Sequence, residues 1–234
     1  MLRKPLAFVK KDFLAESSYK LSFIFRIFSV MTSLLSYYFI DKMFGHRVVG
    51  YLEEFGVNYF SYVLLSTAFF SYVGVGLGSF SGRIRSEQVQ GTLEALLLTP
   101  TKVPTILFSM SLWNLLFATL NMLIYLIAGR YLFRISFDNV NILSAFVILI
   151  LTILSFSSLG ILSASFIMVF KRGNPVGWLI SSLEGLIGGV YFPVAVLPVW
   201  VQFLAKFLPI TYAIRAIELA VYRNYSLAQL SEET

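Results

Sequence analysis

The sequence contains no cysteine and only one histidine, His46, among its 234 residues. Without cysteine the chain has no disulfide framework and no thiolate metal site. A single histidine provides neither a zinc cluster nor a Ser/His/Asp arrangement with a second candidate base. The phosphate-binding pattern G-x-x-x-x-G-K-[ST] is also missing, which removes that route to binding ATP. We therefore expect no catalytic centre, metal or cofactor in this chain.

Charge is sparse as well, at 13% of the residues, whereas 58% are hydrophobic and the mean hydropathy is +0.80. No stretch of ~50 residues has the composition of a soluble domain. Apolar runs of about 20 residues recur instead, which is typical of membrane-spanning helices. The fold class is therefore expected to be all-α: a polytopic helical membrane protein, with residues 1–234 forming a single transmembrane domain. The net charge of +6 is better explained by lysine and arginine in cytoplasmic loops than by nucleic-acid binding.

Five apolar segments predict about five transmembrane helices, at residues 21–40, 57–80, 105–128, 142–170 and 176–196. The fourth segment exceeds a ~30 Å hydrocarbon core, so it must tilt, bend or protrude. Residues 1–20 place Leu6, Val9 and Phe13 on one helical face and predict an interfacial helix along the cytoplasmic surface. The alternative for this segment is the solvated start of the first span. With the N-terminus inside, eleven of the 18 lysines and arginines lie on the cytoplasmic side. This bias predicts a multi-pass protein of the cell membrane with a cytoplasmic N-terminus.

Residues 83–104 form a short polar and amphipathic loop between the second and third segments. Ser86 can cap a helix start there, and Glu87 is favourable near its positive end. Gly91 interrupts the pattern, and Thr92 can cap a second short helix. That helix would carry Leu93, Leu96 and Leu97 on one face and Glu94 near its start, and it would end at Thr99 and Pro100. A short rigid helix between two spans can transmit force to or from a soluble partner. The alternative is a membrane-surface helix that packs on its own subunit.

Glu184 lies near the middle of the fifth segment, where an acid costs about 2.5 kcal/mol or more on insertion scales. It therefore needs a partner or water. Asn114 and Asn121, seven residues apart on one face of the third segment, are candidate partners, as is Ser181. Glu184 either lines a translocation path or dimer seam, or is a protonated side chain bonded between helices.

Glycines cluster in the second segment and again in the fifth, where Gly188 and Gly189 lie. Small residues at these positions permit close helix approach. Residues 197–234 are divided by Pro198 and Pro209 into pieces too short to span a bilayer. Together with Pro193, these prolines predict an external helical segment, half-buried or re-entrant. Trp200 and Tyr212 are suited to the membrane interface there.

Three ordered patterns resemble the membrane subunit of a type-2 ATP-binding-cassette (ABC) exporter. The first is Arg85-Ser86-Glu87 followed by residues 91–100, GTLEALLLTP. The second is GGVYFP at 188–193 followed by LPVW at 197–200, and the third is LPITYA at 208–213. The resemblance implies six spans, two permease subunits in a homodimer or heterodimer, and separate ATP-binding-cassette ATPase subunits that bind ATP and Mg. No sixth apolar run follows the fifth, so a sixth span is expected to be missing here.

The leading hypothesis is a permease subunit that couples a partner's ATP hydrolysis to export. In this hypothesis the leucines of the 83–104 loop dock in an ATPase groove, while Glu87 and Glu94 meet basic residues at its rim. One alternative is an ion- or proton-coupled carrier that uses Glu184. Another is a non-transporting membrane scaffold. Nothing in the sequence identifies the cargo.

Overall fold

The computed structural model describes residues 9–11, 13–14, 20–43, 50–99, 103–137, 140–170 and 175–233. In these ranges the chain is helical and contains no strand, which confirms the all-α fold class. Four helices are long and apolar enough to cross a membrane: α2 (Lys20–Met43), α3 (Tyr59–Val89), α5 (Val103–Tyr131) and α6 (Ile142–Phe170). Most of the predicted N-terminal helix, residues 1–20, lies outside the described residues, but residues 9–11, 13 and 14 are helical.

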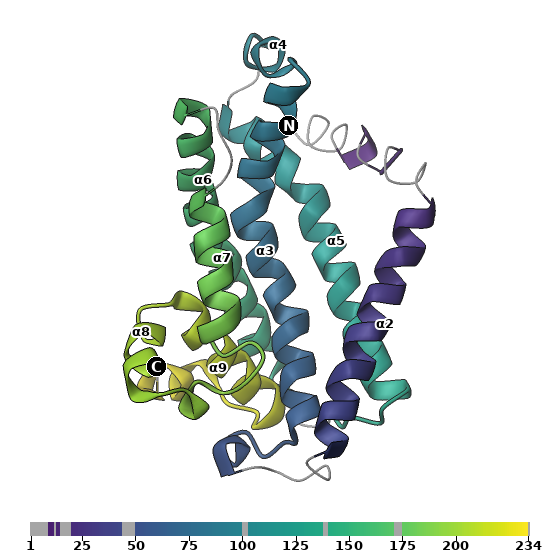
Figure 1. Ribbon diagram of the computed structural model, residues 1–234, viewed down its shortest axis with the longest axis vertical. Helices are drawn as coiled ribbons and strands as arrows, with labels where there is room; N and C mark the ends of the chain where they lie inside the picture. The colour runs from purple at the N-terminus through teal and green to yellow at the C-terminus, as the bar shows by residue number, and fades with distance from the viewer. Residues whose placement is uncertain are drawn as a thin grey trace.

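The long helices run side by side along the longest axis of the molecule (Figure 1). A short helix, α4 (Leu93–Leu97), lies at one end of this bundle, which we call the α4 end. Two other short helices, α8 (Val199–Ala205) and α9 (Pro209–Tyr222), lie at the opposite end, which we call the α9 end.

Helix α3 forms the centre of the bundle. It packs along much of its length against α6 and α5, and its buried side chains include Leu64, Ala68 and Phe69. Helix α2 contributes far less to the core and exposes large apolar side chains such as Phe25 and Phe28. Such exposure is compatible with a bilayer, because lipid tails are as apolar as these side chains. The molecule is therefore organised around α3.

The predicted segments agree with the helices to different degrees. The fourth has the same bounds as α6, and the third lies within α5. The fifth segment differs, because α7 (Pro175–Ile187) has 13 residues and does not continue to residue 196. Gly188 donates its backbone N–H to the Glu184 carbonyl at 3.0 Å, and Gly189 has a φ of +92°, which ends the helix. Helix α7 is not among the four long helices, so the fifth span stays a prediction.

The α9 end is built from short pieces, as the prolines predict. These are the 3-10 helices η1 (Gly50–Leu52) and η2 (Val194–Val196), together with α8, α9 and α10 (Leu227–Glu233). Pro198 caps the start of α8, and Pro209 occupies the first turn of α9. Trp200 is 70% exposed, and the Tyr212 hydroxyl donates to the Lys206 carbonyl at 2.9 Å. Whether this segment re-enters the membrane stays a prediction.

Candidate functional site

The junction between α3 and α4 is a tight, fully bonded turn. Gly91 has a φ of +69°, a left-handed conformation that glycine adopts without steric cost. Its N–H donates to the Gln88 carbonyl at 3.2 Å, and the Thr92 N–H donates to the Glu87 carbonyl at 2.9 Å. These two bonds form a Schellman motif, which satisfies carbonyls that a helix end leaves unpaired. Ser86 and Glu87 therefore lie in the last turns of α3, and the expectation that Ser86 starts a helix is wrong.

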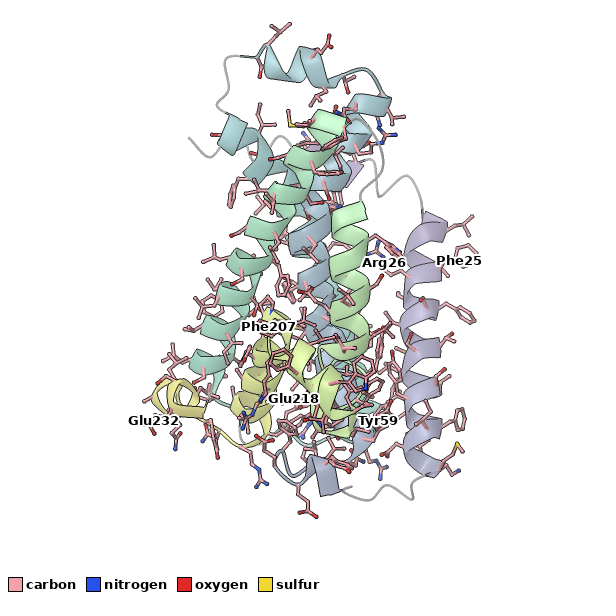
Figure 2. The ribbon with its side chains drawn as sticks, turned by 60° about the vertical axis from the view of Figure 1, so that its left-hand side comes forward. Phe25, Arg26, Tyr59, Phe207, Glu218 and Glu232 are labelled. Carbon is pink, nitrogen blue, oxygen red and sulfur yellow. The ribbon has the colours of Figure 1, made fainter. Side chains whose placement is uncertain are left out.

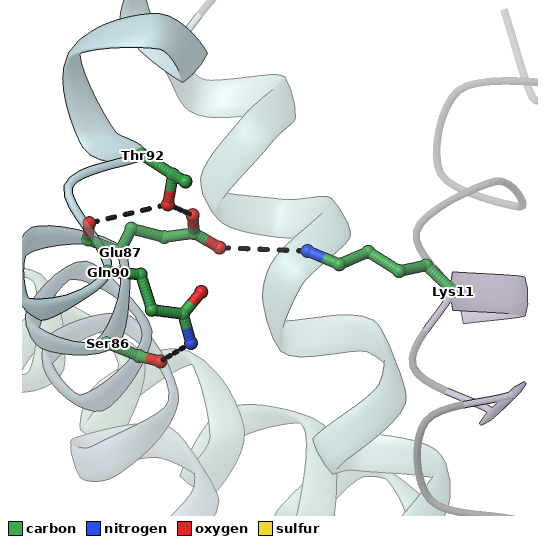
Figure 3. A network of polar contacts seen from close by, with 5 residues as sticks. All are labelled: Lys11, Ser86, Glu87, Gln90 and Thr92. Atoms are coloured by element: carbon green, nitrogen blue, oxygen red, sulfur yellow. Dashed lines mark hydrogen bonds and ion pairs between the residues drawn. The ribbon is translucent and has the colours of Figure 1, made fainter.

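A polar network braces this turn (Figure 3). Glu87 accepts a hydrogen bond from the Thr92 hydroxyl on one carboxylate oxygen and pairs through the other with the Lys11 ammonium at 3.8 Å. The Gln90 amide donates to the Ser86 hydroxyl at 3.2 Å beside it. The Glu87 side chain is only 10% exposed, whereas that of Lys11 is 65% exposed. Glu87 thus faces its own chain, contrary to the expectation that it lies at a partner's rim, and it fixes the direction in which α4 leaves α3.

Helix α4 begins directly after Thr92, as predicted, but ends at Leu97, before the predicted end at Thr99 and Pro100. Its side chains lie in two different surroundings. Leu93 packs inward against Phe80, Ile84 and Ala164, so it belongs to this chain's own core. Glu94 is exposed, and Leu98, just after the helix, is 86% exposed. Thr99 is exposed too, whereas Pro100 and the Leu97 side chain lie outside the description. The surface that α4 itself offers therefore carries the Glu94 carboxylate and the apolar Leu98 side chain, and Leu93 is not part of it.

The described part of the N-terminal segment lies against the same end of the bundle. The ring of Phe13 meets that of Trp113 on α5 edge-on, with centroids 5.9 Å apart. Together with the ion pair between Lys11 and Glu87, this contact joins the segment to both α5 and α3. The described part of the segment is thus in contact with both helices between which α4 lies.

Glu184 is buried near the end of α7. Its side chain is 1% exposed, and its Oε2 atom has no hydrogen-bond partner within the part of the chain that the structure describes. A Cβ atom on Gly188 would lie 2.2 Å from Cγ2 of Ile210 and 2.4 Å from the Glu184 carbonyl oxygen. Gly188 therefore permits the end of α7 to meet α9 closely, and Glu184 lies at that contact.

The two asparagines lie elsewhere. Asn114 donates from its amide to the Ser79 hydroxyl at 3.1 Å, and both Asn114 and Asn121 line a cavity between α2, α3 and α5. Glu184 does not line this cavity, so its expected pairing with these asparagines is wrong. The polar positions of the membrane region thus form two separate groups. One holds the asparagines, and the other holds Glu184 with Gly188.

A buried acid escaped the sequence reasoning. Glu218 of α9, labelled in Figure 2, is 0% exposed and accepts a hydrogen bond from the Ser66 hydroxyl of α3 at 2.8 Å. Burial raises the pKa of Glu218 well above its usual value. The spacing of Ile210, Ile214 and Ile217 indicates one apolar face of a helix. Glu218 lies four residues after Ile214 and therefore shares that face, which is the sequence feature that indicates its burial.

The α9 end also contains wide, open hollows. One of about 530 Å³ lies between η1, the Gly188–Gly189 turn and α9, and is lined by the basic side chains Lys206 and Arg215. Arg215 pairs with Glu54 at 2.7 Å across it. Gly189, Pro193 and Tyr212 line the same hollow. Of the residues predicted for the external segment, Pro193 and Tyr212 line this hollow, whereas Pro198, Trp200 and Pro209 do not.

The sequence matches a model of a known protein family. The family model described as ABC-2 type transporter covers residues 6–222. No curated protein matches the sequence.

Proposed function

The chain belongs to the ABC-2 type transporter family and is a membrane-spanning permease subunit; from this premise we propose that it couples ATP hydrolysis by a separate ATPase subunit to export of a substrate. The ATPase partner supplies the sites for ATP and Mg. A second permease subunit, the same chain or a related one, completes the path. The α4 end faces the cytoplasm, as the placement of lysine and arginine favours.

One observation carries the proposal: α4 is fixed to α3, the central helix of the bundle. The Schellman turn at Gly91 and the bonds from Glu87 to Thr92 and Lys11 leave α4 little freedom relative to α3. A force applied to α4 therefore reaches α3, and through it α5 and α6, which pack along it. An ATPase pair that binds one arrangement of α4 more tightly shifts the whole permease toward that arrangement.

The exposed chemistry of this end supports docking to a groove with an apolar floor and a basic rim. Glu94 presents a carboxylate, and Leu98 and Val89 are 86% and 72% exposed. Apolar anchors buried at the centre of an interface supply most of its binding energy, and charges at the rim add orientation. In this proposal Leu98 is the apolar anchor of the interface, and Glu94 orients α4 by pairing with the basic rim. Glu87 does not contact the ATPase but holds α4 in place relative to α3.

The test is retention of the ATPase subunit when the permease is purified in detergent from cells that express both. Glu94→Arg and Leu98→Asp are each expected to lower the retained ATPase roughly tenfold or more, the effect of losing an interface anchor. Glu232→Arg is the matched control, because Glu232 is exposed on α10 at the α9 end. Retention that survives both changes at the α4 end contradicts the proposal.

A second variant distinguishes docking of the ATPase from transmission of its movement to α3. Thr92→Val removes the hydroxyl that bonds to Glu87 but leaves the exposed residues of α4 unchanged. We expect it to retain the ATPase and yet to lower the ATPase rate of the purified complex relative to the unmodified complex. If Thr92→Val fails to retain the ATPase, the turn contributes to docking and not to the transmission of movement.

One observation favours a second candidate, a proton-coupled carrier. Glu184 is buried and its Oε2 atom lacks a partner among the described residues. If this candidate is correct, Glu184→Gln removes a pH-dependent flux that needs no ATP. Flux in proteoliposomes without any ATPase subunit distinguishes it from the exporter, which is inactive under that condition.

A further inference from the structure

Another cavity at the α9 end, which we call the Arg134 cavity, takes no part in the proposed coupling. It has a volume of about 600 Å³, within the range of ~300–1,000 Å³ that is typical of small-molecule sites. It lies where α2 and α5 end and α3 begins (Figure 1), and Val221 and Tyr222 of α9 complete its lining. Candidate membrane spans end at Met43 and Tyr131, and another begins at Tyr59. The cavity therefore lies at the level where these spans meet the lipid headgroups.

Arg134 supplies the positive charge of this cavity. Its side chain is exposed, and it forms no hydrogen bond or ion pair with any residue that the structure describes. The other charged residue of the lining, Asp41, is 0% exposed. Asp41 accepts bonds from the Asn58 amide at 3.2 Å and from the Phe60 N–H at 3.3 Å, so its charge stabilises the positive end of α3. An anion that enters the cavity therefore meets the Arg134 guanidinium and not the Asp41 carboxylate.

The backbone at Arg134 is strained, and its neighbours keep it so. Arg134 has a φ of +57°, a left-handed conformation that is unfavourable for residues other than glycine. Ile135 is buried and donates its N–H to the Gly129 carbonyl at 3.0 Å. Phe133 packs against Phe60, with ring centroids 4.7 Å apart. Both neighbours of Arg134 are thus fixed in place. Strain that the surroundings enforce in this way is common at ligand-binding sites.

Two hydroxyl groups in the lining are also available to a ligand. Ser61 is only 8% exposed, yet its hydroxyl has no hydrogen-bond partner within the described ranges, and the same holds for the exposed Ser136. A buried polar group normally has a partner, so Ser61 indicates that a ligand or water completes the site. A guanidinium donates two parallel bonds to phosphate. Phosphate has further oxygens for the two hydroxyls, whereas a carboxylate has only two oxygens in all.

The surface beside the Arg134 cavity is apolar. Tyr131 and Leu132, which directly precede the lining residue Phe133, are 79% and 65% exposed. Met43, at the end of α2, is exposed as well. Acyl chains are as apolar as these side chains and cover such surface in a bilayer. A ligand that combines an anionic headgroup with apolar chains therefore matches both the cavity and its surroundings.

We propose that the Arg134 cavity binds the headgroup of an anionic phospholipid. The Arg134 guanidinium holds the phosphate, and the hydroxyls of Ser61 and Ser136 donate to its remaining oxygens. The acyl chains lie along Tyr131 and Leu132. Phosphatidylcholine is a poorer ligand, because its quaternary ammonium brings a second cation close to Arg134. The inference is independent of the proposed coupling to an ATPase, since it concerns binding in the absence of ATP.

Native mass spectrometry of the purified, delipidated full chain, with phosphatidylglycerol or phosphatidylcholine added at equal concentration, tests the site. The unmodified chain is expected to retain phosphatidylglycerol roughly tenfold better, and Arg134→Asn is expected to abolish this preference. Asparagine tolerates the left-handed conformation, so this variant leaves the backbone undisturbed. Lys206→Gln is the matched control, because Lys206 is an exposed cation at the same end that lines a different hollow. Equal losses in both variants, or no preference in the unmodified chain, overturn the proposal.

Two further measurements test the hydroxyl and the lipid separately. Ser61→Ala is expected to weaken retention of phosphatidylglycerol severalfold, because it removes a donor to the phosphate. Its thermal unfolding in lipid-free detergent should be unchanged, since the hydroxyl has no partner in the described part of the chain. Unchanged retention in Ser61→Ala contradicts the assigned site. Soluble glycerol phosphate at equal concentration should not displace the lipid, and displacement would show that the ligand is a free phosphate ester instead.

Discussion

Glu184 and Glu218 are two buried carboxylic acids, and each has one oxygen without a hydrogen-bond partner among the described residues. A carboxylate in such surroundings costs several kcal/mol of desolvation unless it takes up a proton. Glu218 has one bond, from the Ser66 hydroxyl at 2.8 Å, which tethers α9 to α3. Its environment therefore favours the neutral form and makes the fit between these two helices sensitive to pH.

Glu218→Gln is expected to stabilise the protein at neutral and alkaline pH. Burial raises the pKa of Glu218 in the folded state, so the unfolded chain alone ionises as the pH rises above the usual value of 4.5. The unmodified protein thus loses stability as the pH rises above that value, and Gln, which cannot ionise, avoids the loss. The variant's advantage in thermal unfolding, measured from about pH 5 to about pH 8 in detergent, should grow with pH.

The control for this prediction is Glu232→Gln, which changes an exposed acid of the neighbouring α10. It removes the same charge without removing a buried group, so its effect on unfolding should not vary with pH in this way. An advantage of Glu218→Gln that is constant across the pH range would mean that packing, and not ionisation, is responsible.

At the scale of residues, sequence reasoning identified Glu184 but not Glu218, and the difference has a physical cause. Glu184 interrupts a long apolar segment, so its polarity is conspicuous in the sequence. Glu218 belongs to the short helix α9, where its spacing from Ile214 is the one indication in the sequence that it lies on the buried face, and the packing of α9 on α3 and α6 shows that it does. The separation of Asn114 from Glu184 likewise depends on which helices are neighbours, and apolar segments do not specify that.

Helix packing depends on particular glycines. Among those suggested by the sequence, Gly76 makes a close contact in α3, whereas a Cβ on Gly74 or Gly78 would meet nothing within 4 Å. Gly160 of α6 is the partner of Gly76, since a Cβ there would lie 2.1 Å from the Gly76 carbonyl oxygen. Small residues at such crossings let the two backbones approach closely. Helices α3 and α6 thus approach each other closely where Gly160 meets the Gly76 backbone.

Gly160→Ala is expected to destabilise the protein by about 1–3 kcal/mol or more, because the added methyl group meets backbone that cannot move aside. Gly82→Ala is the matched control in α3, where a Cβ meets nothing within 4 Å. There the change should stabilise the helix by up to about 1 kcal/mol. Thermal unfolding of both variants in detergent is the measurement, and shifts of the same sign would contradict this account of the crossing.

At the scale of elements, hydropathy identified the long apolar helices but did not always give their ends. It matched α6, which has the same bounds as the predicted segment. It placed the end of the second segment at residue 80, whereas α3 continues to Val89. The residues beyond 80 are polar, so the apolar run stops, but the backbone bonds of a helix do not require apolar side chains. The sequence feature that indicates the end of α3 is Gly91, which interrupts the helical pattern of the 83–104 loop.

At the scale of the whole molecule, the fold class and the family followed from features that are spread along the chain. Recurring apolar segments indicated a helical membrane protein, and ordered local motifs indicated the family that matches residues 6–222. Relative positions were harder to obtain, because a membrane helix exposes apolar side chains to lipid and to its neighbours alike. The central place of α3 and the peripheral place of α2 therefore became apparent only from burial.

The orientation of the whole molecule is the premise on which coupling depends, and the lack of cysteine makes it directly measurable. Single cysteines introduced as Gln90→Cys and Glu232→Cys replace exposed side chains at the α4 end and the α9 end. A membrane-impermeant maleimide should label Glu232→Cys in intact cells, and it should label Gln90→Cys only after the membrane is opened. This pattern follows from the excess of lysine and arginine at the α4 end, which the positive-inside rule places in the cytoplasm. Labelling of Gln90→Cys in intact cells would put α4 on the outer surface, where no ATP-driven partner could reach it.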